Sequence, residues 1–261
     1  MPAALFLPDG DLLVPTEHTR GPWAPDAQHG GPPAALLARA VEAAPAPVPM
    51  QLVRLAVRLL RPVPLRPVRA RVEVVRDGRR VQLVEAALED EDGAELSRAS
   101  GLRIRCLDEP LELPDGDGTL PPPPGPDQAP PSVHAPQPPS FVETGVELRF
   151  VRGSIRRRGP ATVWVRLGHP VVLGEPPSPM MRAAAAADFG NGVSSLLDWQ
   201  SSLFINPDLT VYLHRPPRGE WICLDARTEL SPGGAGVAHS ALSDLHGTVG
   251  HALQALLVGP R

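Results

Sequence analysis

Lysine is absent from this sequence: all 25 basic residues among its 261 are arginines. With abundant alanine, proline and glycine, this bias is typical of a GC-rich genome and does not indicate a phosphate-binding design. The net charge is −4, and the scattered arginines alternate along apparent strands, as on the solvated faces of sheets. One run of three basic residues occurs, Arg156 to Arg158. We therefore expect no nucleic-acid partner.

Cysteine is scarce, and several catalytic motifs are missing. Cys106 and Cys223 are too few for a disulfide scaffold, and each lies in an apolar segment, so we expect two buried thiols. The eight histidines and two cysteines show no metal-ligand spacing. A Gly-x-Ser-x-Gly elbow, a phosphate loop and a dinucleotide fingerprint are also lacking. We expect no metal, no cofactor and no serine-hydrolase chemistry.

Long apolar runs are absent as well. The chain has no charged start followed by an apolar segment, and no apolar stretch of membrane-spanning length. We expect a cytoplasmic protein without a membrane partner.

A tandem repeat is the strongest pattern that is present. Residues 55–62 (LAVRLLRP) reappear 154 positions later as residues 209–216 (LTVYLHRP). The same spacing relates residues 87–93 to 241–247, and Leu102 to Leu256. A constant spacing over about 50 residues predicts two copies of one structural unit.

Each copy combines a helix with antiparallel strands. In the first copy, Pro32 and Pro33 precede an alanine- and leucine-rich helix, and Asp77-Gly78 and Asp92-Gly93 are typical hairpin turns. In the second copy, a helix is expected after Pro179. The strands are expected at residues 50–61, 67–77, 79–90, 94–107, 145–152, 161–169, 208–216, 219–230, 234–244 and 247–258. This order predicts an α+β fold in which sheets curl around central helices.

Proline marks the boundary between the copies. Residues 109–140 contain clusters such as Pro121 to Pro124 and few apolar residues, as in an extended connector. Proline-rich ligand motifs for a partner domain are the alternative, but the position between two repeats favours a linker. The sequence thus predicts an N-terminal unit at 1–108, a linker at 109–140 and a C-terminal unit at 141–261 that carries the polar site.

Several short segments resemble the acyl-CoA thioesterase II group and its thioesterase-like relatives. They are Gln28–Gly31, Ala187–Phe189, Asn206–Val211, His214–Pro216 with Glu220–Trp221, and Gln254. The His-Arg-Pro segment followed by Glu-Trp is the most specific. The resemblance implies a double hotdog fold, in which two tandem helix-wrapped antiparallel sheets form a pseudo-dimer. It also implies hydrolysis of a fatty acyl-CoA type thioester and association into a homodimer.

The same resemblance implies three catalytic residues. Family members hold a water with an Asp, a Ser or Thr, and a Gln, and the matching positions carry Asp188, Asn206 and Gln254. Asn206 replaces the hydroxyl residue, and its amide still donates and accepts hydrogen bonds. The first copy has Leu52 and Ser100 where the second has Asn206 and Gln254, so the polar site is expected in the second copy alone.

The residues themselves fit thioester hydrolysis. Asp188 is a carboxylate in an alanine-rich helix, where it is poorly solvated. This environment suits it to act as the base and as the water-orienting group. Backbone N–H groups at Gly30 and Gly31, where the first helix begins, would polarise the carbonyl, and His29 would contact substrate. The remaining substrate-binding candidates are apolar and would line the acyl chain: Leu36, Phe189 and Val193.

Other interpretations stay open at this level. Asp188 could bond the following Gly190-Asn191-Gly192 turn, and Gln254 could be a satisfied buried amide. The second candidate class is a non-catalytic protein that binds acyl groups or acyl-CoA, and the departure at Asn206 is the ground for it. A hotdog hydratase or an acyl-transfer relative is a further alternative, although Asp26 and His29 match only faintly the Asp and His that hydratases carry in one loop.

Overall fold

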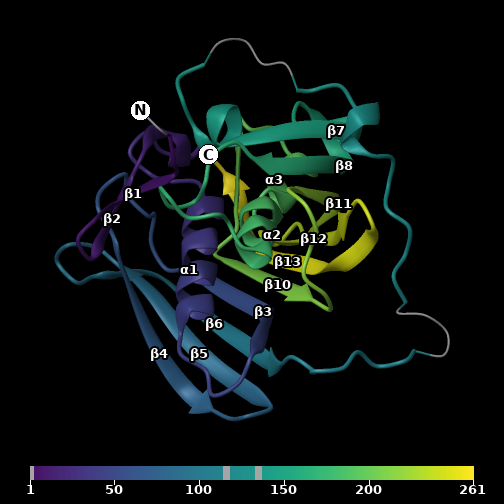
Figure 1. The fold of residues 1–261 in the computed structure, drawn as a ribbon. Coiled ribbons are helices and arrows are strands. Elements are labelled where there is room, and N and C mark those ends of the chain that lie inside the picture. The colour runs from purple at the N-terminus through teal and green to yellow at the C-terminus, as the bar shows by residue number, and fades with distance from the viewer. Residues whose placement is uncertain (1–2, 114–117, 133–136) are drawn as a thin grey trace.

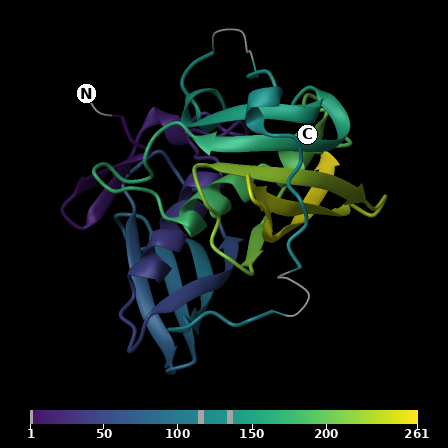
Figure 2. The same ribbon diagram turned by 45° about the vertical axis from the view of Figure 1, so that its right-hand side comes forward.

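One antiparallel sheet curves around two helices that lie side by side (Figures 1 and 2). The computed structural model describes residues 3–113, 118–132 and 137–261, and eleven strands of this sheet fall within those ranges. The strand order is β4-β5-β6-β3-β10-β13-β12-β11-β8-β7, with β9 paired to β13. The two predicted units meet at the centre, where Ala56 of β3 lies opposite Thr210 of β10.

The bounds of the elements agree closely with the predicted segments. The first unit contains α1 (Gly31–Ala43), β3 (Met50–Leu59), β4 (Arg69–Asp77), β5 (Val81–Glu89) and β6 (Glu95–Arg105). The second contains β7 (Val146–Ser154), β8 (Arg157–Leu167), α2 (Pro179–Ala187), α3 (Gly190–Val193), β9 (Ser202–Ile205), β10 (Asp208–Leu213), β11 (Trp221–Leu230), β12 (Ala235–Asp244) and β13 (Gly247–Pro260). The repeat is confirmed in space, because β3, β5 and β6 stand 154 residues before strands in the matching order, β10, β12 and β13.

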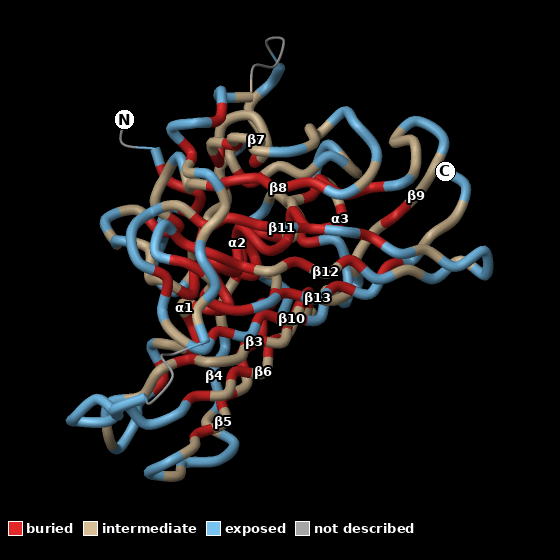
Figure 3. Tube along the Cα trace, turned by 90° about the vertical axis from the view of Figure 1, so that its right-hand side faces the viewer, coloured by how far each residue is buried: buried red, intermediate tan, exposed pale blue. Residues whose placement is uncertain are grey.

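Small side chains allow α1 and α2 to approach closely. The five consecutive alanines of α2, Ala183 to Ala187, are all buried, and α1 packs against this helix. A Cβ atom on Gly31 would lie 2.8 Å from the carbonyl oxygen of Ala185, so the contact requires glycine. Ser178 begins α2 by accepting a hydrogen bond from the Met181 N–H at 3.0 Å. Figure 3 shows that the helices and the inner strands form one buried core, whereas the outermost strand β4 is largely exposed.

Three short strands were not predicted. The hairpin of β1 (Phe6–Asp9) and β2 (Leu12–Pro15) forms a separate two-stranded sheet, and β9 is equally short. Phe6 bridges to Val172 and Leu13 bridges to Val68, so this hairpin contacts both units. Strands of four residues carry too little alternation to be recognised from a pattern.

The described part of the proposed linker packs on the second unit. Trp164 of β8 donates its indole N–H to the Pro124 carbonyl at 2.8 Å, and the Ser132 N–H bonds the Leu148 carbonyl at 3.0 Å. The segment also contains a short 3-10 turn, η2 (Pro126–Gln128). Residues 114–117 and 133–136 of the expected linker lie outside the described residues.

One expectation about the thiols is wrong. Cys223 is buried in β11, and burial followed by the nearby Asp225 charge raises the pKa of its thiol. Cys106 is exposed, because β6 ends one residue before it. Within the described ranges, none of the helices is both long enough and apolar enough to cross a membrane.

Candidate active site

Asp188 lies where the two units meet, at the end of α2. It is the C-terminal cap of that helix and is only 4% exposed. Its carboxylate rests directly on the start of α1: a Cβ atom on Gly30 would be 2.7 Å from Oδ2 and 2.9 Å from Oδ1. The glycine therefore creates the space that the carboxylate occupies. The N-terminal end of α1 is the positive end of its dipole, which favours a carboxylate there.

Three side chains converge on this carboxylate. Asn206, between β9 and β10, donates from Nδ2 to Oδ1 at 2.8 Å. Gln254 of β13 directs its Nε2 toward the same oxygen at 3.5 Å, and His29 places Nδ1 2.8 Å from Oδ2. The structure therefore brings the three predicted catalytic residues together and adds His29.

Gln254 is held in one orientation by the backbone around α3. Its Oε1 accepts the Asn191 N–H at 3.0 Å, and its Nε2 also lies 3.4 Å from the Asp188 carbonyl oxygen. A Cβ atom on Gly190 would lie 2.6 Å from Oε1, so α3 can lie on this amide only because glycine stands there. The side chain is 2% exposed. Its position is therefore determined before any ligand arrives.

Asn206 and Asp208 have different roles. Asn206 Nδ2 also lies 3.2 Å from the Asp208 carbonyl, while the Asp208 carboxylate accepts the Ala255 N–H at 2.7 Å. Asp208 thus fixes the start of β10 against β13, which is a structural role.

The first copy lacks this arrangement. At the positions equivalent to Asn206 and Gln254, Leu52 is buried and Ser100 contacts Arg54 at 3.4 Å. These residues of the first copy form no second polar site around a carboxylate.

A cavity of about 610 Å³ opens beside the carboxylate. Asp188, His29, Gly30 and Asn206 are part of its wall. The rest is mainly apolar and comes from both units, including Trp23, Leu59, Leu60, Val63, Phe189, Trp199 and Ile205. Such a cavity, with few converging polar groups, is typical of a site for a small, largely apolar ligand.

The expected substrate-binding residues divide into two groups. His29, Gly30 and Phe189 line the cavity. Leu36 and Val193 are 0% and 1% exposed, belong to the core and are not part of the cavity wall. Gly31 is also outside the wall and instead forms the contact between the helices.

Gly30 presents the backbone donor at the start of α1. Pro32 and Pro33 have no N–H, and the Gly31 N–H points to His29 Nδ1 at 3.1 Å. The Gly30 N–H donates to no other group in the described part of the chain, and Gly30 lines the cavity. It is therefore the candidate donor for a polarised carbonyl.

Two tryptophans form a wall that the sequence pattern did not reveal. Trp23 and Trp199 stack with ring centroids 4.8 Å apart, and both line the cavity. Arg261 lies over the Trp23 ring and donates to the Trp199 carbonyl at 2.8 Å. Both tryptophans come from irregular segments, where no periodicity indicates which way a side chain points.

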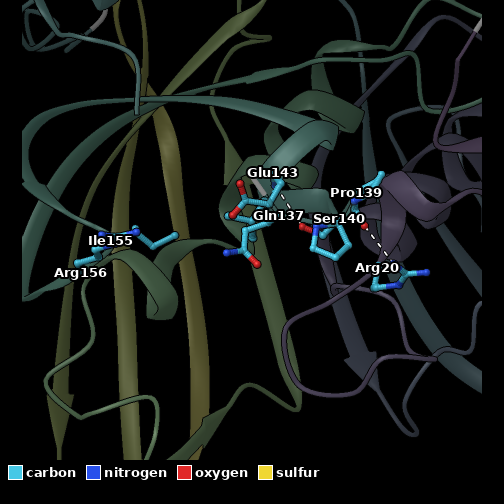
Figure 4. A pocket seen from close by; sticks show the side chains of 9 residues that line it. Arg20, Gln137, Pro139, Ser140, Glu143, Ile155 and Arg156 are labelled. Carbon is cyan, nitrogen blue, oxygen red and sulfur yellow. Dashed lines mark hydrogen bonds between the residues drawn. The ribbon is translucent and has the colours of Figure 1, made fainter. Parts of the chain in front are cut away.

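A shallower cavity of about 410 Å³ adjoins the first (Figure 4). Ser140, Val142, Glu143 and Ile155 line both. The short helical turn η3 (Phe141–Gly145) forms one side, where Glu143 donates its N–H to the Ser140 hydroxyl at 3.2 Å. Arg20 and Arg156 also line this outer cavity, so its wall carries two positive charges beside the negative charge of Glu143.

The arginine of the His-Arg-Pro segment is structural. Arg215 forms a bidentate ion pair with Asp244, at 2.6 and 2.8 Å. Burial by itself would raise the pKa of Asp244, but Arg215 and the N–H groups of Arg218 and His246 outweigh it and lower that pKa to about 2. The pair fastens the β10–β11 turn to the β12–β13 turn.

The architecture defines a double hotdog protein of the α+β class: two helices wrapped by a duplicated antiparallel sheet. Many solved structures match this fold, including the following three. A conserved hot dog protein of unknown function from Alicyclobacillus acidocaldarius is 17% identical with a TM-score of 0.74, covering 97% of this chain and 95% of that one. An acyl-CoA thioesterase II, TesB2, from Mycobacterium marinum is 17% identical with a TM-score of 0.61, covering 97% and 93%. A tesB protein of Mycobacterium avium subspecies paratuberculosis is 16% identical with a TM-score of 0.65, covering 95% and 93%.

Family models identify the chain more specifically. The acyl-CoA thioesterase N-terminal domain matches residues 19–104, and the acyl-CoA thioesterase C-terminal domain matches residues 118–258. The chain belongs to the acyl-CoA thioesterase family. No curated protein is significantly similar to it in sequence.

Proposed function

We propose that this protein hydrolyses a fatty acyl-CoA type thioester with a water activated at Asp188. The observation that carries this proposal is a nearly buried carboxylate in the wall of an apolar cavity, with an amide and an imidazole hydrogen-bonded to it. Such a group can attract a proton from a bound water. Asn206 lines the cavity and would orient that water, whereas Gln254 lies outside the wall and would position the carboxylate.

The cavity also suits the acyl chain, the thioester carbonyl and the phosphates of the substrate. Its aromatic and aliphatic wall would hold the acyl chain, and the Gly30 N–H would stabilise negative charge on the carbonyl oxygen. Arg61 lines the main cavity, and Arg20 and Arg156 line the outer one. These arginines would attract the phosphates of coenzyme A, which are the charged part of this substrate class.

The direct test is release of free thiol from acyl-CoAs of increasing chain length. Asp188→Asn keeps the size of the side chain, removes its charge, and is expected to lower kcat by about 10²- to 10⁴-fold. Gln254→Ala is expected to lower kcat with a smaller effect. The matched control is Asp225→Asn, because Asp225 is a half-exposed carboxylate of β11 paired with Arg152 outside the cavity.

Three results would each give a different conclusion. Thiol release that Asp188→Asn leaves unchanged would refute the proposed site. Saturable binding of acyl-CoA without thiol release would identify a binding protein. Faster turnover of acyl-CoA than of an acyl-N-acetylcysteamine thioester, which lacks the phosphates, would support the role of the arginines.

A further inference from the structure

We infer that His29 is a catalytic residue: its Nε2 accepts the proton of the attacking water and later delivers it to the leaving sulfur, while Asp188 orients the ring. This inference rests on the proposed hydrolysis and identifies which atom of the Asp188 site carries the proton. It assigns to His29 a chemical step in place of the substrate contact expected from the sequence.

The first argument concerns the carboxylate. Asp188 Oδ1 already accepts from Asn206 at 2.8 Å and faces Gln254 at 3.5 Å, while Oδ2 contacts His29 at 2.8 Å. A Cβ atom on Gly30 would lie within 2.9 Å of both oxygens, so Gly30 packs closely against the carboxylate. The Asp188 side chain is 4% exposed and the His29 side chain 11%, so the ring is the more accessible of the two groups to a water in the cavity.

The second argument concerns the ring. The His29 side chain is 11% exposed and lines the cavity. Phe189 and Phe141 flank the ring, with centroids 4.8 and 5.1 Å away, which restricts its rotation. Nδ1 faces Asp188, whereas Nε2 has no hydrogen-bond partner among the described residues. Nε2 is therefore the unengaged basic atom of the pair.

The tautomer follows from the partners of Nδ1. This atom lies 2.8 Å from an Asp188 oxygen and 3.1 Å from the Gly31 N–H, and it cannot donate to one and accept from the other at once. A charge-assisted hydrogen bond is roughly twice as strong as a neutral one, so the contact with ionised Asp188 places the proton on Nδ1. The lone pair then lies on Nε2.

The reaction balances with water as the only co-substrate. The water oxygen bonds to the thioester carbon as its proton passes to Nε2, and the carbonyl electron pair moves to the oxygen. Collapse of this intermediate restores the carbonyl, breaks the C–S bond and sends the proton from Nε2 to sulfur. A carboxylic acid and a free thiol leave, and His29 returns to its starting state.

The test compares His29→Gln with His29→Ala in the thiol-release assay. We expect His29→Gln to lower kcat at least about 10²-fold and to change KM less than about threefold. Added imidazole is expected to restore part of the kcat of His29→Ala, because it can enter the vacated space. The control is His239→Gln, because His239 belongs to the outer face of β12, and its kcat is expected to stay at the wild-type value.

The outcomes separate this inference from the function on which it rests. If His29→Gln keeps kcat within threefold while Asp188→Asn abolishes it, the carboxylate takes the proton itself and the role of His29 is refuted. If the wild-type protein binds acyl-CoA without thiol release, the proposed function fails first. Should the variants not fold, nitrogen NMR of the wild-type histidines decides: an Nδ1–H tautomer for His29 supports the inference, and an Nε2–H tautomer overturns it.

Discussion

Replacing Gly30 with alanine is expected to disable the site without unfolding the protein. The new Cβ would lie 2.7 Å from Asp188 Oδ2, whereas ordinary van der Waals contact begins at 3.4 Å, so the carboxylate must retreat by about 0.7 Å. The carboxylate cannot rotate away freely, because Asn206 and His29 both hold it at 2.8 Å. A shift of that size stretches at least one of the two contacts beyond hydrogen-bonding distance.

The magnitude follows from this displacement. A misplacement of about 1 Å in an active site can cost about 10²-fold in rate, so a shift of about 0.7 Å is expected to lower kcat by roughly 30-fold. Overpacking of this kind costs about 1–3 kcal/mol, which a domain of this size tolerates. Thiol release from acyl-CoA measures the first effect, and urea unfolding measures the second.

Gly259→Ala is the matched control. A Cβ atom at Gly259 would meet nothing within 4 Å, and its backbone is not in the left-handed region. Both kcat and stability are expected to remain at the wild-type level. A Gly30→Ala protein with unchanged kcat and unchanged stability would refute the argument that the position of the carboxylate governs the reaction.

Two predictions concern stability and pH. The pKa of Asp244 is lowered to about 2 from 3.8, so its ionised form contributes about 2 kcal/mol at neutral pH, and this is lost as the pH falls from about 4 through 2. Asp244→Asn, which removes the carboxylate that Arg215 contacts at 2.6 Å, is expected to lower the free energy of unfolding in urea by about 3–5 kcal/mol at pH 7 and by less at pH 2. Equal losses at both pH values would contradict this assignment. Burial raises the pKa of Glu42 above 4.5, and this effect outweighs the opposing effects of the Ser178 hydroxyl and Arg103. The contribution of Glu42 to the stability of the fold therefore declines as the pH rises from about 4.5 through that raised pKa. Glu42→Gln is expected to remove this decline between pH 4 and 8, and an unchanged pH dependence would show that Glu42 does not titrate in that range.

Much of the fold was predictable because it depends on local patterns. The alternation in residues 50–61 and 234–244 predicted β3 and β12 to within two residues of their ends. The constant spacing of 154 predicted that the two units share one topology, since equivalent hydrophobic positions occupy equivalent places in a sheet. The β1–β2 hairpin was missed because strands of four residues carry too weak a pattern.

The sequence indicated which polar residues belong to the candidate site, but only partly which apolar residues line its cavity. The family resemblance indicated Asp188, Asn206 and Gln254, and they do meet around one carboxylate. Leu36 and Val193 were expected at the acyl chain, yet both lie in the core. Helical spacing identifies an apolar face, but it does not tell which part of that face meets a cavity and which part meets another helix.

The amino-acid sequence by itself determined the duplication and the pairing of helix with antiparallel strands, and it predicted that Asp188, Asn206 and Gln254 of the second copy form the polar site. Periodicity, turns and repeat spacing are properties of neighbouring or regularly spaced residues, so the sequence contains them directly. Only the tertiary structure decided that His29 of the first unit contacts Asp188 of the second. That contact depends on how closely α1 and α2 pack, which Gly30, Gly31 and the alanines of α2 permit but no local pattern specifies.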